Sequence, residues 1–131
     1  MDRAKLYLLA RQSEDGAWRS GTYGVLRDGA TPAQLGDAAA VIEEAGFTTC
    51  DDLVHGYGGG YLPPVIGSAS RPAGKLPDIT LRAGMMVVVQ PNVITPDGKA
   101  GVQTGEVVLI TDDGVERLHA APRGFLRIGR A

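Results

Sequence analysis

The sequence lacks several features that would assign a protein of this size to a special class. It has one cysteine, Cys50, so no internal disulfide can form. No apolar run approaches the roughly 20 residues that a membrane-spanning helix needs. The N-terminal segment turns acidic where a secretory signal would carry its cleavage site. We therefore expect a cytoplasmic protein with no membrane partner.

The charges are also close to balanced. The chain has 13 basic and 15 acidic residues, a formal net charge of -2, and its arginines are dispersed, so we expect no nucleic-acid partner. A single thiol without neighbouring ligands is more often a small buried apolar group than a nucleophile, and Cys50 is expected to be one. At 131 residues the length suits one hydrophobic core, so residues 1–131 are predicted to form a single domain.

Two helical segments are predicted before any strand. The first covers residues 2–27, where apolar residues recur at helical spacing. The second covers residues 32–45 and has clearer ends. Thr31 and Gln34 form a Thr-x-x-Gln capping box, and Gly46 is placed to end the helix in a left-handed turn. Together these segments predict a helical hairpin.

The pattern then changes to one typical of strands. Short runs of apolar and β-branched residues predict strands over residues 48–55, 85–90, 106–111 and 115–119. Asp113-Gly114 is a hairpin turn signal between the last two. Residues 67–77 have no periodic apolar pattern and predict a long loop. The fold class is therefore α+β, with helices preceding a mainly antiparallel sheet.

Three segments in order carry a resemblance to a known family. Residues 54–58, Val-His-Gly-Tyr-Gly, are similar to its Gly-His-Gly-Ile-Gly element. Residues 81–91 follow its Leu-x-x-Gly-Met-x-x-x-x-Glu-Pro, and residues 101–114 follow Gly-Val-Arg-Ile-Glu-Asp-x-x-x-Val-Thr-x-x-Gly. The chain thus resembles the C-terminal half of the pita-bread metallopeptidases, which include methionine aminopeptidase, Xaa-Pro aminopeptidase, prolidase and creatinase. This implies half of a pita-bread fold, a helical hairpin packed on a curved sheet.

The resemblance also implies a metal site, most of whose ligands this sequence lacks. His55 stands where the family has a coordinating histidine, but Gln90 and Gly105 stand where it has two glutamates. The family's two aspartate ligands precede the region that this chain resembles. A neutral amide does not supply the anionic oxygens that hold two divalent cations together. Glu106, one residue further on, would reach the site only through a bulge. We expect no metal, no cofactor and no peptidase activity.

The remaining polar residues predict a small-molecule site in the old cleft. His55 is the candidate general acid or base, because an imidazole exchanges protons near neutral pH, with a hydrogen-bonded core histidine as the alternative. Amides and aromatic rings are common in ligand sites, although they also fill cores and lids. The predicted ligand-binding residues are Tyr57, Tyr61, Gln90, Gln103 and Glu106.

Three functions stay open from the sequence. One is a metal-independent enzyme or binding protein for a small molecule, with His55 in the cleft. Another is a non-catalytic module that pairs with a second half-domain. The last is a part of an active, metal-dependent Xaa-Pro-type aminopeptidase. Half of a pita-bread domain leaves a sheet edge and an apolar face uncovered, so we expect a homodimer or pairing with a second half-domain.

Overall fold

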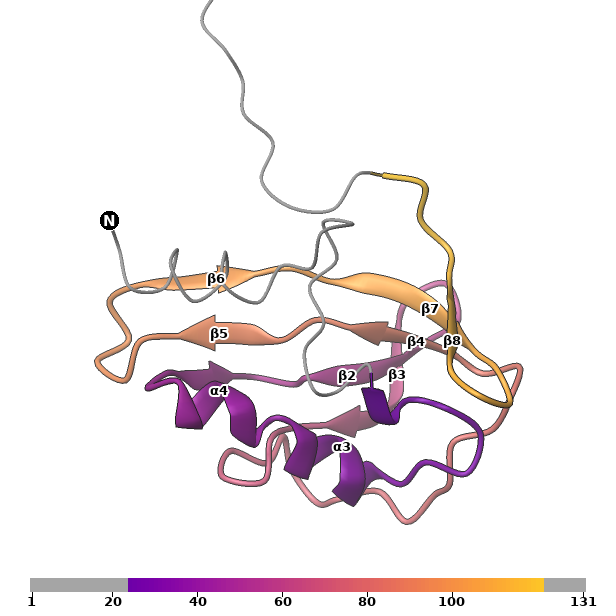
Figure 1. Ribbon diagram of the computed structural model, residues 1–131, viewed down its shortest axis with the longest axis horizontal. Helices are drawn as coiled ribbons and strands as arrows, with labels where there is room; N and C mark the ends of the chain where they lie inside the picture. Colours follow the sequence, from indigo (N-terminus) through magenta and orange to yellow (C-terminus); the bar gives the residue numbers. More distant parts are fainter. Residues whose placement is uncertain (1–23, 122–131) are drawn as a thin grey trace, which may run out of the picture.

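The computed structural model describes residues 24–121, so the first predicted helix, residues 2–27, lies almost entirely outside the described residues. Two short helices come first and the strands follow, which is the α+β order (Figure 1). The helices are α3 (Pro32–Ala38) and α4 (Ala40–Glu44). The strands are β1 (Thr48–Cys50), β2 (Val54–Tyr57), β3 (Tyr61–Ile66), β4 (Met86–Val89), β5 (Asn92–Ile94), β6 (Gly101–Gln103), β7 (Glu106–Ile110) and β8 (Val115–Arg117).

The helical segment begins and ends where the sequence indicates. The Thr31 hydroxyl accepts from the Gln34 amide at 3.4 Å, and the Gln34 side chain accepts from the Thr31 amide at 2.9 Å, which completes the capping box. Gly46 has a φ of 82° and donates to the Glu43 carbonyl. The predicted helix is interrupted at Ala39, which is the C-cap residue of α3 and the N-cap residue of α4. The segment therefore forms two short helices instead of one.

The strands form two antiparallel sheets with the orders β1-β5-β6 and β3-β2-β4-β7-β8. Three chain segments run from one sheet into the other. Each is interrupted once, at residues 51–53, 90–91 and 104–105. In Figure 1 the broken strands run side by side, with β1 leading into β2, β4 into β5 and β6 into β7. The segment expected as one strand over residues 48–55 is therefore two strands with a bend between them.

The hydrophobic core lies between the helices and one face of the sheets. Helix α3 contacts β3, and α4 contacts β1. The buried side chains are mostly leucine, isoleucine and valine, among them Leu35, Ile42, Leu53, Val54, Val87, Val89, Val108 and Ile110. In the ladder, His55 pairs with Val88 and Val88 with Val107, so these three side chains share the opposite face. No helix within residues 24–121 is long and apolar enough to cross a bilayer.

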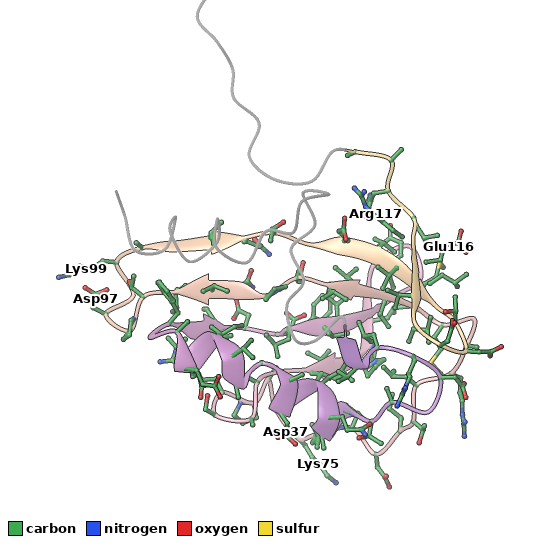
Figure 2. All side chains as sticks on the ribbon, in the orientation of Figure 1. Asp37, Lys75, Asp97, Lys99, Glu116 and Arg117 are labelled. Atoms are coloured by element: carbon green, nitrogen blue, oxygen red, sulfur yellow. The ribbon has the colours of Figure 1, made fainter. Side chains whose placement is uncertain are left out.

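A tight turn at one end of the molecule fixes how β5 and β6 pair. Asp97 accepts from the Thr95 hydroxyl at 2.6 Å and from the Lys99 amide at 3.1 Å. These hydrogen bonds lower the pKa of the Asp97 carboxyl below its ordinary value. Figure 2 shows Asp97 and Lys99 at this exposed tip. The turn sets Asn92 opposite Gln103, a pairing on which the site depends.

A close approach of β2 and β3 requires glycine at position 56. The register of the two strands shifts between His55 and Gly56, and a Cβ on Gly56 would overlap the carbonyl group of Pro63. A methyl group there must push the strands apart, because the obstructing atoms belong to the backbone.

We expect Gly56→Ala to lower the free energy of unfolding by about 1 to 3 kcal/mol, the usual cost of overpacking. Gly60→Ala is the matched control, since a Cβ there would meet nothing within 4 Å, and we expect a change within about 0.5 kcal/mol. Urea denaturation followed by circular dichroism measures both. Equal stability of the two variants would contradict the close approach.

Candidate functional site

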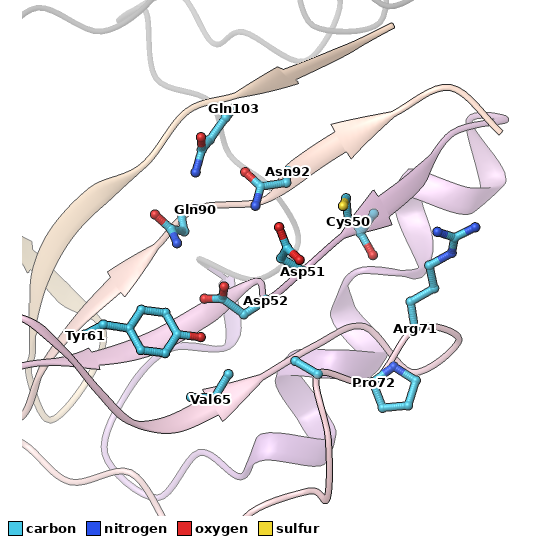
Figure 3. A pocket seen from close by; sticks show the side chains of 12 residues that line it. Cys50, Asp51, Asp52, Tyr61, Val65, Arg71, Pro72, Gln90, Asn92 and Gln103 are labelled. Carbon is cyan, nitrogen blue, oxygen red and sulfur yellow. The ribbon is translucent and has the colours of Figure 1, made fainter. Parts of the chain in front are cut away.

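A cavity of about 620 Å³ lies along the line where the three strands break. Ligand cavities commonly have volumes of this order. Asp51 and Asp52 come from the first break and Gln90 from the second, while Asn92 and Gln103 lie just beyond the breaks on β5 and β6. Figure 3 shows these carboxylates and amides facing a common space. The cavity therefore exists because all three strands bend at the same level.

A row of side chains across the smaller sheet forms one wall of the cavity. Cys50 pairs with Asn92 and Asn92 pairs with Gln103, so the three side chains project from one face of the sheet. All three line the cavity. The expectation of a buried Cys50 was wrong: the thiol is exposed, because β1 is at the edge of its sheet and its last residue faces the cavity.

The acidic part of the cavity contains oxygen atoms that have no hydrogen-bond donor. Asp52 is 4% exposed, and its Oδ2 is buried without a partner, as is Oδ1 of Asn92. Within residues 24–121, neither Asp51 nor Asp52 has a salt-bridge partner. Asp51 also has a φ of 60°, a left-handed conformation that costs free energy for a residue other than glycine. The unpaired buried acceptors and the costly backbone conformation make this bend the candidate site.

The opposite wall is a loop that follows β3 and is held to β1. The hydroxyl groups of Ser68 and Thr49 are 3.0 Å apart, and both residues are buried. Ser68 Oγ also accepts from the Arg71 amide at 3.1 Å. This anchoring holds Arg71, Pro72 and Ala73 on the cavity wall. The long loop predicted over residues 67–77 is present, and it is tied to the sheet at its start.

Tyr61 covers His55 at the β3 end of the cavity. The two rings are 4.2 Å apart between centroids, and His55 is only 6% exposed while Tyr61 is 58% exposed. Partial burial, the negative charge of the neighbouring Asp52 carboxylate and the hydrogen bond that the Tyr61 hydroxyl donates to it all raise the pKa of that hydroxyl. His55 Nδ1 lies 2.8 Å from the Gly56 carbonyl oxygen. Because that oxygen can only accept, Nδ1 carries the proton, and Nε2 has the free lone pair in the neutral ring.

The residues predicted from the sequence have three different positions. Tyr61, Gln90 and Gln103 meet on the cavity wall. His55 lies behind the Tyr61 ring and does not line the cavity directly. Tyr57 is 40% exposed and lies outside the cavity lining.

Glu106 faces away from this group. It pairs with Val89 in the row that includes Val54, on the face opposite His55. Its carboxylate forms a 2.5 Å ion pair with Arg117 of β8, which is labelled in Figure 2. The β4–β7 ladder has no register shift that would turn Glu106 toward the cavity.

Among the cavity residues that were not predicted from the sequence are Asp51, Asp52, Asn92 and Arg71. The adjacent aspartates were read as part of one strand over residues 48–55, where alternate side chains would face opposite ways. The usable signal was the pair of acidic residues itself, which is unfavourable inside a strand. Asn92 follows Pro91 and lies in a strand of three residues, which gives no periodic pattern.

The residues at the family's metal-ligand positions do not fit a two-metal centre. Within residues 24–121, no three side chains of histidine, cysteine, aspartate and glutamate converge as a metal ion requires. Gly105 is packed against Gln90, and a Cβ at position 105 would lie 2.7 Å from the Gln90 Cβ. A side chain at position 105 would therefore require Gln90 or the neighbouring backbone to shift.

A model of metallopeptidase family M24 matches residues 17–112. The chain belongs to metallopeptidase family M24. Among solved structures, the fold is similar to prolidase from Pyrococcus furiosus, with a TM-score of 0.67 and 24% identity over 92% of this chain and 32% of that one. The predicted family and the predicted α+β half of a pita-bread fold are thereby confirmed.

Two further M24-like structures agree on the fold. The X-Pro aminopeptidase of Thermotoga maritima has a TM-score of 0.66 and 24% identity over 92% of this chain and 31% of its own. A dipeptidase of Mycobacterium ulcerans has a TM-score of 0.65 and 27% identity over 92% of this chain and 30% of its own. A search among curated proteins gave no match. The chain thus spans about a third of the length of these solved structures.

The Oδ2 atom of Asp52, which has no hydrogen-bond partner, leads to a stability prediction. We expect Asp52→Asn to raise the free energy of unfolding by about 1 kcal/mol, because it replaces a buried carboxylate, one oxygen of which lacks a donor, with a neutral amide of the same shape that can still accept from Tyr61. Asp78→Asn changes the same charge on an exposed loop and should have no effect. Thermal unfolding of the protein alone measures both variants. A less stable Asp52→Asn protein would show that the carboxylate is already compensated.

Proposed function

We propose that this M24 protein binds a small polar molecule in its cleft without a metal ion and has no peptidase activity. The observation that carries the proposal is the cavity at the strand breaks, where two buried oxygens, Asp52 Oδ2 and Asn92 Oδ1, lack donors. A buried acceptor without a partner destabilises a fold, and such groups are retained where a ligand satisfies them. Its exposed free thiol, Cys50, suits the reducing cytoplasm, where we place the protein.

If the protein is an enzyme, His55 is the catalytic residue that we propose. Its Nδ1 donates to the Gly56 carbonyl, which leaves Nε2 as the nitrogen available to the ligand. The Tyr61 ring lies between His55 and open solvent. If a ligand displaces the Tyr61 ring, the polar atoms of that ligand can approach Nε2 of His55. On this proposal the reaction is proton transfer, with His55 as general acid or base.

The packing at the breaks supports a metal-free site more than an inherited peptidase centre. Gln90 and Gly105 occupy the glutamate positions, and a Cβ at position 105 would lie 2.7 Å from the Gln90 Cβ, so a side chain there would require Gln90 to shift. The acidic residues that are present, Asp51 and Asp52, come from another strand break. The opposing candidate is a part of an active metallopeptidase, which the chain's 32% coverage of the prolidase structure allows.

Metal content separates these two functions. We expect protein purified in excess manganese or cobalt to contain far less than one ion per chain by elemental analysis, and to show no hydrolysis of Xaa-Pro dipeptides. Ligand-observed NMR with a mixture of polar metabolites in the presence of a chelator should identify a bound compound. Gln103→Leu should weaken its binding about tenfold through the loss of one hydrogen bond, whereas Leu76→Ala on an exposed loop should not. Stoichiometric metal with peptidase activity would contradict the proposal.

We further propose that the chain associates through the sheet face that carries His55. Tyr57 and Met86 project from this face and are 40% and 41% exposed, while β3 is the open edge of the larger sheet. Large apolar side chains on an exposed face and an unpaired edge both favour association. Because the chain resembles one half of a two-half fold, the partner we commit to is a second copy.

Light scattering after size exclusion tests this assembly. We expect a mass of twice the 13.7 kDa of one chain. Met86→Lys should shift the protein toward the monomer, because it places a charge at the apolar contact. Leu76→Lys makes the same kind of change in the loop between β3 and β4 and should leave the dimer intact. A monomeric wild-type protein would exclude the homodimer.

A further inference from the structure

The cavity has an excess of negative charge and of hydrogen-bond acceptors on one side. Asp51 and Asp52 bring two carboxylates to the bend, and Figure 3 shows them next to each other below the amides. Arg71 is the basic side chain on the described lining, and it makes no ion pair with either carboxylate. In Figure 3 its guanidinium group lies at the Cys50 end, away from Asp52. A ligand at the bend would therefore complement the site best if it carried a positive charge.

The unsatisfied atoms also specify the hydrogen-bonding groups of the ligand. Asp52 Oδ2 and Asn92 Oδ1 can only accept, and each is buried without a donor. A hydroxyl group donates one hydrogen bond and brings no charge. A primary ammonium group donates three hydrogen bonds and brings a full positive charge. It therefore satisfies both oxygens and neutralises one carboxylate at the same time.

The other lining residues indicate a ligand that is partly hydrocarbon. Val65, Pro72 and Ala73 form an apolar part of the lining, and the Tyr61 ring borders the acidic part. An ammonium group near a tyrosine ring gains a further cation–π attraction. A Ca²⁺ or Mg²⁺ ion is a poorer occupant, because it takes six or more oxygen ligands, water included, and would leave these apolar groups without contacts. The lining thus suits a charged head joined to an apolar body.

We propose that the cavity binds a small organic amine, with its ammonium group at Asp51, Asp52 and Asn92 and its hydrocarbon part against Val65 and Pro72. This inference rests on the proposed metal-free function and adds the chemical class of the ligand. It also assigns a role to Asp52: its carboxylate is the charge that distinguishes an amine from a neutral molecule of the same shape.

Calorimetric titration with 2-phenylethylamine and with 2-phenylethanol tests the assignment, because the two probes differ only in the polar group. We expect the amine to bind and the alcohol to bind at least tenfold more weakly, as the loss of a charge-assisted hydrogen bond implies. Asp52→Asn should weaken amine binding about tenfold or more, whereas Asp78→Asn on the exposed loop should not change it. Asn92→Leu is a second variant that removes the other acceptor, and circular dichroism checks that each variant is folded.

The outcomes distinguish this inference from the function on which it rests. If amine and alcohol bind equally, or if neither Asp52→Asn nor Asn92→Leu weakens the amine, the amine assignment is overturned. If the metabolite screen instead finds a neutral or anionic ligand in the cavity, the metal-free function stands and only the amine assignment fails. If manganese or calcium binds stoichiometrically and displaces the amine, the acidic bend is a metal site and both proposals fail.

Discussion

The bend shared by three neighbouring strands is the constraint on which the rest of this structure depends. At the bend, the Gln90 amide donates to the Leu53 carbonyl at 2.9 Å, so the ladder continues across the interruption. The packing of Gly105 on Gln90 lets the third strand bend at the same level. Without these contacts the acidic residues, the amides and the tyrosine would belong to unrelated parts of two sheets. The acidic and amide side of the site is thus a property of the sheet's geometry, and the loop at residues 71–73 completes it.

The scaffold was largely predictable because its signals are local. The capping box at Thr31 and the glycine at position 46 depend on residues a few positions apart. The segments matching β4 and β7 have runs of β-branched and apolar residues, and β8 follows the Asp113-Gly114 turn. Strand β3 was missed because consecutive prolines, Pro63 and Pro64, argue against a strand, although an edge strand tolerates them. Strands β5 and β6 have three residues each, too few to show alternation.

The candidate site was only partly predictable, for a different physical reason. Tyr61, Gln90 and Gln103 were predicted as ligand-binding residues, and the structure places all three in the lining of the cavity. Asp52 could not be recognised, because its direction depends on where β1 ends and β2 begins. That boundary is set by hydrogen bonds to strands far along the chain. Glu106 shows the converse, since strand alternation alone places it on the face opposite His55.

The cavity has two walls that belong to different parts of the fold, and the buried hydroxyl groups of Thr49 and Ser68 join them. One wall consists of strand ends, whose positions are fixed by the β1-β5-β6 ladder. The other consists of residues 71–73, which the Ser68 hydroxyl holds and whose backbone packs closely against Gly67, while their side chains are exposed. Because those side chains are exposed, substitutions there would reshape the apolar side of the cavity with little effect on the core. On the proposed function, changes in these few loop residues alter the ligand preference while the acidic side of the cavity stays the same.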